Sequence, residues 1–509
     1  MSITEIEAEL LRGKIREILG ENMRAAATDE SVAPHSDGDD PWWAIAAQHP
    51  THAVITRDKV PIAADFSGEP DVRPSAVEAP SITADHFVPR APKSLDEAGL
   101  THSEIEALVL KFLLARGPMA GNRIAAQVRL PFPVVVQCLR PLKEERVLVY
   151  KGATPLGDYV YELTEIGRER ASRYAERCTY FGSAPVTIEE YVASVATQLA
   201  DRRKPKLADL RRAFGGLVLS DESLAQLGQA MSSGSGLFLY GAPGNGKTSI
   251  AERITAAYGG TVWIPRAISA SGDIIRIFDP NIHRPAPLDP ATEDVDGDAI
   301  DRRWVRIYRP TIVAGGELTM ASLEINTIAA TGISEAALQI KSNLGTLVID
   351  DFGRQRVSPS ELLNRWIVPL ARQHDYFTLA SGRKIQLPFA QMLVFSTNLD
   401  PSDLVDEAFL RRIPYKIDIS DPSEEEFREI MLRAAAEMGL RCDDEVVDYC
   451  IEHHFKASGR PMRRCHPRDL LSQGQDFCAF HDLPPALTRE ALDVAVKNYF
   501  ALIHLPVTG

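Results

Sequence analysis

The octet Gly-Ala-Pro-Gly-Asn-Gly-Lys-Thr at residues 241–248 decides the fold of this chain. It fits the phosphate-binding loop pattern G-x-x-x-x-G-K-[ST] at every fixed position. The apolar run 237–240 before it predicts a buried strand, and the apolar periodicity of residues 249–258 after it predicts a helix. Since strand, loop and helix are the context that this motif needs, the alternative of a glycine turn before an ordinary helix is disfavoured.

The loop predicts a binding site for a nucleoside triphosphate. Its glycines let successive N–H groups turn toward an anion, and the helix N-terminus adds partial positive charge. We expect Lys247 to reach the β- and γ-phosphates and the Thr248 hydroxyl to ligate magnesium. The candidate nucleotide-binding residues are Gly241, Ala242, Pro243, Gly244, Asn245, Gly246, Lys247, Thr248 and Ser249.

Two further apolar runs end in polar side chains. Residues 346–351 form a predicted strand that ends in Asp350 and Asp351, and residues 392–398 form another that ends in Asn398. A strand beside the loop would place Asp350 near the magnesium ion, as a ligand, and Asp351 near the attacking water. A strand that ends in an ordinary turn is the alternative.

These motifs, with the Phe-Leu-Arg-Arg stretch at 409–412, resemble those of AAA+ ATPases over about residues 213–500. The resemblance implies an α/β fold, in which an AAA+ P-loop parallel-sheet core is followed by a C-terminal helical lid. It implies ATP and Mg²⁺ as cofactors and a ring oligomer, most often a hexamer. The implied catalytic residues are Asp351, Asn398 as sensor 1, Arg412 as an arginine finger acting on a neighbour's nucleotide, with Arg411 as the alternative finger, and Arg468 as the sensor 2 contact to the γ-phosphate.

One position departs from the family pattern. Many members carry Asp-Glu where this chain has Asp350-Asp351, and the shorter carboxylate would slow hydrolysis and favour a switch over a fast motor. The blocks 238–250, 349–357 and 364–370 further resemble bacterial ATPases described as having chaperone activity and associated with Flp pilus assembly.

Two insertions are expected in the core. Residues 265–325 separate the second strand from the acidic strand and contain strand-like segments at 273–278 and 304–308. Residues 376–389 predict a hairpin that turns at Ser381-Gly382, similar to the pre-sensor insertion of an AAA+ branch of activators, unfoldases and helicases. We expect both to face the ring pore or a partner, with extra sheet edging as the alternative. No aromatic-hydrophobic-glycine pore loop is evident, which argues against a processive unfoldase.

Residues 98–180 predict a winged-helix domain. Helices are expected at 103–115, 121–128 and 131–146, the last kinked at Pro141, followed by a hairpin at 147–163. The start of the third helix lacks side chains able to read base edges, so a protein-docking role is favoured over DNA reading. The basic cluster at 202–206 and 211–212 is interpreted as a solvated face, with a phosphate-backbone contact as the alternative.

The sequence divides into six predicted segments. These are an amphipathic helix at 1–24, a disordered Pro-rich linker at 25–97, the winged helix at 98–180, a connecting helical segment at 181–212, the AAA+ core at 213–420 and the helical lid at 421–509.

Composition restricts the function classes. The chain has 509 residues, of which 45% are hydrophobic and 25% charged, and its formal net charge is −14, which opposes nonspecific nucleic-acid binding. No apolar stretch is long enough for a membrane span, and the acidic start does not resemble a secretory signal, so we expect a cytoplasmic protein. Its six scattered cysteines are typical of free thiols in a reduced compartment.

The expected function is therefore ATP hydrolysis in an oligomeric ring that remodels a protein partner of unknown identity. The function would be chaperone-like, with a link to pilus assembly or secretion. The alternative is a nucleotide-switched regulator that binds DNA through the winged helix, and DNA is the less favoured partner. A third hypothesis is a scaffold that binds ATP without turnover.

Overall fold

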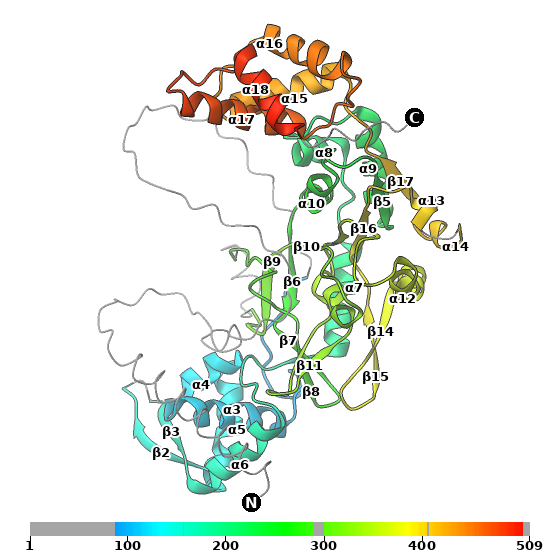
Figure 1. Cartoon of the computed structure of the whole chain (residues 1–509). Helices are drawn as coiled ribbons and strands as arrows, with labels where there is room; N and C mark the ends of the chain where they lie inside the picture. Colours follow the sequence, from blue (N-terminus) through cyan, green and yellow to red (C-terminus); the bar gives the residue numbers. More distant parts are fainter. Residues whose placement is uncertain (1–86, 156, 289–299, 405–406, 502–509) are drawn as a thin grey trace, which may run out of the picture. The chain divides into compact units, whose positions relative to one another are not determined.

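A parallel five-stranded sheet carries the glycine loop, residues 241–248 (Figure 1). Every pair of neighbouring strands is parallel. The strand order is β10 (Thr311–Ala314), β13 (Thr346–Ile349), β16 (Met392–Ser396), β5 (Leu237–Tyr240) and β17 (Tyr415–Asp418). The three middle strands are almost wholly buried, as expected for a parallel sheet that is covered on both faces.

The computed structural model describes residues 87–155, 157–288, 300–404 and 407–501. The expected helix at 1–24 lies outside the described residues, as do residues 25–86 of the expected linker.

Helices pack on both faces of the five-stranded sheet. On one face, α10 (Lys247–Tyr258), α8 (Leu207–Phe214) and α9 (Asp221–Ser233) share a hydrophobic cluster with strand residues such as Val348 and Val394. On the other face, Trp366 of α12 (Pro359–Arg372) packs with Phe238 and Phe395. The segments predicted as strands at 237–240, 346–351 and 392–398 contain β5, β13 and β16, of which the last two end at Ile349 and Ser396, and the helix after the loop is present.

The sheet differs from the sequence prediction in two respects. Strand β16, and not the acidic strand β13, lies directly beside β5. The strand after α10, β6 (Thr261–Pro265), leaves the sheet and pairs antiparallel with β9 (Trp304–Tyr308), while β10 takes the edge position. The expected insertion at 265–325 is therefore too long, because it includes β10 of the sheet.

The remaining inserted strands form a sheet of their own. Its order is β11 (Asn326–Ile328), β12 (Ile333–Glu335), β8 (Asp273–Arg276), β7 (Ala267–Ala270) and β4 (Val186–Thr187). Helix α7 (Ile188–Ala200) packs Tyr191 and Val195 against this sheet. Along the chain, the short helix η1 (Met320–Leu323) comes before β11, and the short helix α11 (Leu338–Lys341) comes after β12. The alternative that the insertion extends the edge of the core sheet holds for β10 and is wrong for β7 and β8.

The hairpin expected at 376–389 is present. Strands β14 (His374–Thr378) and β15 (Lys384–Pro388) pair antiparallel, and the turn contains Gly382 at φ 79°. Phe377 and Leu387 are buried in the same cluster as Tyr191 of α7, so the hairpin packs against the inserted region and does not widen the five-stranded sheet.

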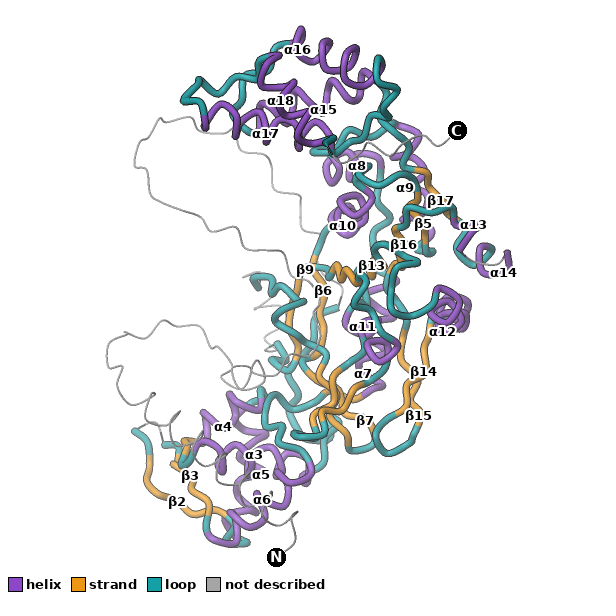
Figure 2. The backbone as a smooth tube through the Cα atoms, viewed as in Figure 1, coloured by secondary structure: helices purple, strands orange, loops and turns teal. Residues whose placement is uncertain are grey.

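An N-terminal module precedes the core (Figure 2). Its elements are α3 (His102–Arg116), β1 (Met119–Ala120), α4 (Gly121–Val128), α5 (Phe132–Glu144), β2 (Leu148–Ala153), β3 (Tyr159–Leu163) and α6 (Glu165–Arg177). The strands form an antiparallel sheet in the order β1-β3-β2. A capping box between Thr101 and Glu104 begins α3, and Pro141 lies inside α5, at the position where a kink is expected.

Residues before this module are packed, contrary to the prediction of a disordered linker, and the segment after it contains the helices α7 and α8. Leu95, inside the expected linker, is 5% exposed in the module's core. The predicted boundary at 212/213 falls inside α8. These residues are ordered because their apolar side chains are buried in the neighbouring clusters.

A buried arginine of the inserted region forms hydrogen bonds to the N-terminal module and to the segment after it. Arg303 is 1% exposed and lies 2.8 Å from the carboxylate of Asp301. Its guanidinium also donates to the carbonyl oxygens of Ala98 at 2.9 Å and Pro185 at 3.1 Å. Such a pair is stable only when its remaining donors are satisfied, as they are by these two carbonyls.

The C-terminal region is helical, as predicted, and we call residues 424–499 the lid. It contains α15 (Glu424–Glu437), α16 (Asp444–Tyr449), a π-helical segment (Cys450–Lys456), α17 (His466–Phe480) and α18 (Arg489–Tyr499). Phe427, Phe455, Leu470 and Leu492 belong to a core cluster formed by lid residues. The short helices α13 (Pro401–Leu404) and α14 (Glu407–Leu410) lie between β16 and β17.

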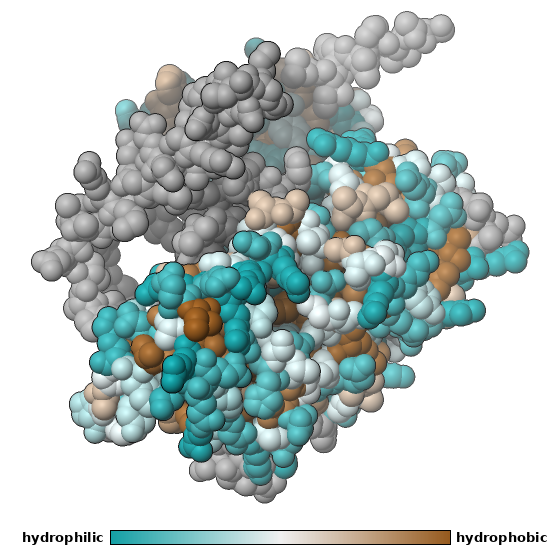
Figure 3. Space-filling view, turned by 90° about the horizontal axis from the view of Figure 1, so that it is seen from below, coloured by the Kyte–Doolittle hydropathy of each residue, from teal (hydrophilic) through white to brown (hydrophobic). Residues whose placement is uncertain are grey.

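The visible surface has a mixed character. Seen from below, hydrophobic side chains form separate patches among hydrophilic ones (Figure 3). In the N-terminal module the exposed large hydrophobic residues are Leu114, Phe132, Val149, Tyr150, Tyr159 and Ile166. In the part of the chain that the structure describes, no helix combines the length and apolar character that crossing a bilayer requires.

Candidate functional site

The glycine loop joins the end of β5 to the start of α10. Gly246 at φ 83° caps the helix, and Gly244 at φ 85° shapes the turn before it. A Cβ atom on Gly244 would lie 2.6 Å from the Cys465 sulfur, so both the backbone conformation and the space exclude a side chain there. The loop therefore presents its backbone at the N-terminus of a twelve-residue helix, where partial positive charge accumulates.

Lys247 is held at the mouth of the loop by three oxygen atoms. Its ammonium donates to the carbonyl oxygens of Gly241 and Ala242, each at 2.9 Å, and to the Asn398 side-chain oxygen at 2.7 Å. Burial lowers the pKa of Lys247, while the nearby carboxylates of Asp350 and Asp351 act in the opposite direction.

Thr248 and Asp350 connect the loop to the acidic strand. The Thr248 hydroxyl donates to Asp350 Oδ2 at 2.8 Å, although the two residues are 102 positions apart. A hydroxyl and a carboxylate are hard oxygen donors of the kind that Mg²⁺ prefers, so these two residues fit the magnesium ion that the sequence predicts. Gln355 supports the turn after β13 by donating to the Asp350 carbonyl oxygen at 2.7 Å.

Asp351 and Asn398 meet at the ends of neighbouring strands. Asp351 has the left-handed backbone conformation, with φ 50°, which is uncommon for a residue other than glycine. The Asn398 amide nitrogen donates to Asp351 Oδ1 at 3.3 Å, while its oxygen accepts from Lys247. A single amide therefore links the loop lysine to the second carboxylate.

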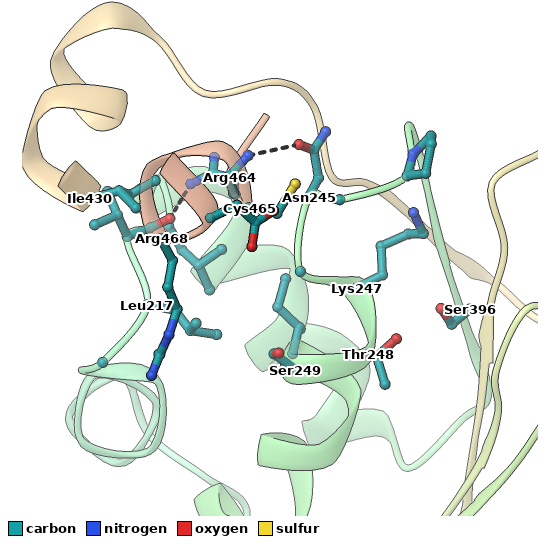
Figure 4. A pocket seen from close by; sticks show the side chains of 18 of the residues that line it. Leu217, Asn245, Lys247, Thr248, Ser249, Ser396, Ile430, Arg464, Cys465 and Arg468 are labelled. Atoms are coloured by element: carbon teal, nitrogen blue, oxygen red, sulfur yellow. Dashed lines mark hydrogen bonds between the residues drawn. The ribbon is translucent and has the colours of Figure 1, made fainter. Parts of the chain in front are cut away.

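These groups line one cavity of about 650 Å³. Among the predicted site residues, those that line it are Pro243, Gly244, Asn245, Gly246, Lys247, Thr248, Ser249, Asp350, Asp351, Asn398 and Arg468. Gly241 and Ala242 contribute carbonyl oxygens to Lys247. In the view of Figure 4 the Arg468 side chain lies on the opposite side of the cavity from Lys247.

The two candidate finger residues lie elsewhere. Arg411 and Arg412 follow α14, are exposed, and are absent from the described residues that line this cavity. Of the predicted site residues, these are the ones that the structure does not bring to the glycine loop of the same chain.

The cavity also contains residues that the sequence did not single out. Arg354, three positions after Asp351, lines it, and the lid contributes Arg433, Glu437 and Arg464. The short spacing from Asp351 was an available signal for Arg354. No local pattern marks the lid residues, because only the packing of α15 and α17 beside the loop brings them to the site.

The lid contacts the glycine loop directly. The Cys465 N–H donates to the Gly244 carbonyl oxygen at 2.9 Å, and the Arg464 N–H donates to the Asn245 side-chain oxygen at 3.3 Å. His466 fixes this lid segment, since its Nδ1 accepts from the Arg463 N–H at 3.1 Å. Burial lowers the pKa of His466 to about 4, so the ring is neutral near pH 7 and can accept that bond.

The basic cluster before the core is largely engaged within the chain. Arg203 and Arg212 contact the Asp209 carboxylate at 3.2 Å and 2.7 Å, and Arg202 lies over the Tyr258 ring at 4.9 Å. Hydrogen bonding from the Lys206 backbone, with these two arginines, lowers the pKa of Asp209. These contacts give the cluster a structural role in holding α8.

Comparison with known proteins gives a partial match. Residues 423–498 match a family described as "Domain of unknown function (DUF8689)", which covers the lid alone. No curated protein matches the chain. Among solved structures, the chain is similar to the Holliday junction branch migration motor RuvB of Thermotoga maritima, with 14% identity and a TM-score of 0.34, over 55% of this chain and 70% of that one.

A second solved structure is NtrX from Brucella abortus in complex with ADP. It shows 14% identity and a TM-score of 0.35, over 67% of each chain. At these identities and TM-scores, a likeness does not establish a shared fold or activity.

Proposed function

We propose that this chain is an ATPase of the AAA+ type, which binds ATP and Mg²⁺ in the 650 Å³ cavity and hydrolyses the nucleotide. The observation that carries the proposal is the 2.8 Å contact between the Thr248 hydroxyl and the Asp350 carboxylate, at the N-terminus of α10. A glycine loop, a cation and an acidic strand end meeting at one cavity are the parts that phosphoryl transfer requires.

The chain's own residues have separate roles in binding magnesium, binding the phosphates and activating the water. Thr248 and Asp350 would hold Mg²⁺, which when bound neutralises charge on the phosphate oxygens. Lys247 and the loop N–H groups bind and orient the β- and γ-phosphates. Asp351, with Asn398 beside it at 3.3 Å, orients the attacking water and accepts its proton.

Further cations stabilise the charge that develops on the transferred group. Arg468 acts within the chain, from the first turn of α17 in the lid. Arg412 acts on the nucleotide of a neighbouring copy, which is why we assign a ring oligomer to the active form. Its position outside the cavity of its own chain supports a role between subunits.

The N-terminal module recruits the protein partner. Its order of elements and its β1-β3-β2 sheet support a winged-helix assignment, and its exposed Phe132, Tyr150 and Tyr159 suit a protein surface. We infer that ATP turnover remodels this partner, in a chaperone-like role linked to pilus assembly or secretion, in the cytoplasm.

A second candidate function is a nucleotide-switched regulator that binds DNA. The observation in its favour is that α5 turns Gln137 and Arg140 toward solvent, while Val134 and Val135 are buried. Gln and Arg are side chains that read base edges in the major groove. The net charge of −14 argues against it.

The test is nucleotide turnover by the purified full chain. We expect Mg²⁺-dependent release of phosphate from ATP, lost in Lys247→Ala and retained in the control Lys497→Ala, which removes an exposed lysine from α18. Absence of both binding and turnover in the unaltered chain would refute the proposal. Binding without turnover would instead favour the scaffold hypothesis.

A DNA-binding titration at several salt concentrations separates the two partner classes. Tight, salt-dependent binding that Arg140→Ala weakens would favour the regulator.

A further inference from the structure

Asn245 of the glycine loop directs its side chain away from the loop. The residue is fully buried, and its amide nitrogen donates to the Ile419 carbonyl oxygen at 3.1 Å and to Asp421 Oδ1 at 2.8 Å. Its side-chain oxygen accepts from the Arg464 N–H at 3.3 Å. All three partners belong to the segment after β17 or to the lid, so this side chain serves the connection between loop and lid.

Asp421 occupies the hinge between the core and the lid. It lies after β17 ends at Asp418 and before α15 begins at Glu424. Besides Asn245, its Oδ1 atom accepts from the Arg463 guanidinium. One carboxylate thus joins a side chain of the glycine loop to a cation of the lid, and hydrogen bonds of this charge-assisted kind are stronger than neutral ones.

The lid segment 463–465 also contacts the loop and the cavity wall through groups other than Asn245 and Asp421. The Cys465 N–H donates to Gly244, and the Cys465 sulfur fills the space where a Gly244 side chain would lie. Arg464 pairs with Glu426 of α15 at 3.0 Å and donates to the Val218 carbonyl oxygen, so the segment is tied to the cavity wall as well.

This arrangement has a consequence for the nucleotide. The cavity is walled by the loop on one side and by lid residues such as Ile430 and Arg468 on the other (Figure 4). A ligand that lies between two walls leaves faster when one of them moves away. Moving the lid away from the loop breaks the bond that Asn245 accepts from Arg464 and the ion pair of Asp421 with Arg463.

We propose that Asn245 and Asp421, bonded to each other and to Arg464 and Arg463 of the lid, form a latch that keeps the lid closed over the bound nucleotide and thereby sets the rate at which ADP is released. The inference rests on the proposed ATPase function and adds a positioning role for a pair of residues that act through the lid. Because the bonds of the latch are made within one chain, it operates whether or not neighbouring copies are present.

The experiment is stopped-flow dissociation of a fluorescent ADP analogue from the full chain. We expect Asn245→Ala and Asp421→Ala each to release the analogue about tenfold faster, the size typical for losing one hydrogen bond to a charged group. The association rate should be nearly unchanged, because the remaining loop contacts are retained. The matched control Asp448→Ala removes another lid carboxylate, whose partner is Arg428 on the lid itself.

The double variant decides whether the two residues act together. If they form one latch, Asn245→Ala/Asp421→Ala releases the analogue no faster than the faster single variant. Multiplied effects of the two changes, or release at the unaltered rate in both single variants, would overturn the latch. Equal acceleration by Asp448→Ala would also overturn it, since the effect would then be general loosening of the lid.

Two further experimental outcomes have a defined interpretation. If the unaltered chain binds no ADP analogue, the proposed function fails and the latch fails with it. If Asn245→Ala does not fold, Arg463→Gln tests the other end of the latch. It removes the guanidinium that Asp421 binds and leaves the glycine loop unaltered, and faster release is again expected.

Discussion

The ammonium of Lys247 donates a 2.7 Å hydrogen bond to the side-chain oxygen of Asn398, 151 positions later in the chain. The same amide donates to Asp351 at 3.3 Å. Lys247, proposed to bind phosphate, and Asp351, proposed to orient the water, are therefore joined through Asn398, so we expect a change at Asn398 to disturb both.

Replacing Asn398 by Ala should separate binding from catalysis. We expect the turnover of ATP to fall about 10²–10³-fold, the range seen when one positioned polar group is removed from a reacting centre. Nucleotide affinity should change far less, because the loop N–H groups remain. Steady-state turnover and an equilibrium titration with a fluorescent ATP analogue measure the two quantities. Unchanged turnover would show that Asn398 has no role in catalysis.

Replacing Arg354 should reduce ATP turnover more than replacing its neighbour Arg356. Both residues are exposed in the same loop, but Arg354 lines the cavity, three positions after Asp351, whereas Arg356 is not among the described lining residues. We expect Arg354→Ala to lower turnover about tenfold or more by removing a cation near the phosphates, and Arg356→Ala to leave it unchanged. Equal effects of the two variants on phosphate release would contradict this assignment.

Arg412→Ala should leave ATP binding intact and reduce turnover by ~10³-fold, because an arginine finger acts on the transition state alone. In mixtures, the inactive Lys247→Ala chain should partly restore the turnover of Arg412→Ala chains, since it still supplies the finger. Turnover that depends on protein concentration in the unaltered chain would agree with this. Full activity of Arg412→Ala would exclude Arg412 as the arginine finger and would favour Arg411 in that role.

Two buried histidines predict a loss of stability in mild acid. Burial lowers the pKa of His283 and of His466 to about 4, from an ordinary value of 6.5. The unfolded chain therefore takes up protons first as the pH falls below 6.5. The stabilisation from each neutral ring is complete above that pH and is lost progressively toward pH 4, by up to ~3 kcal/mol for the more deeply buried His283 and by less for His466.

The measurement is the free energy of unfolding from denaturant titrations at pH 7.5, 6.5 and 5.5. We expect His466→Asn to show a smaller decline over this range than the unaltered chain, because its amide oxygen can accept the Arg463 bond without titrating. An exposed histidine, His481, provides the control substitution. A decline of the same size in His466→Asn and His481→Asn would contradict the assignment.

Local patterns in the sequence predicted the centre of the site and missed its surroundings. The strand, glycine loop and helix from Leu237 to Tyr258 were predictable because apolar periodicity and glycine spacing act over a few residues. The position of β16 between β5 and β13 was not, since the pairing of parallel strands depends on tertiary packing and not on order along the chain.

The lid side of the site was predictable only in part. Arg468 was found because its motif resembles a known pattern, whereas Asn245 reaches Asp421 across 176 positions and no spacing rule connects them. In the same way, residues 87–97 have a composition typical of a linker, yet the burial of Leu95 fixes them. Apolar contacts from a distant segment can order a stretch whose own composition is polar.

Arg303 has a mechanical implication. Its buried bonds to Asp301, Ala98 and Pro185 connect the N-terminal module to the inserted strands. If the module recruits a partner as proposed, a pull on that partner would reach the proposed ATPase core through these buried bonds.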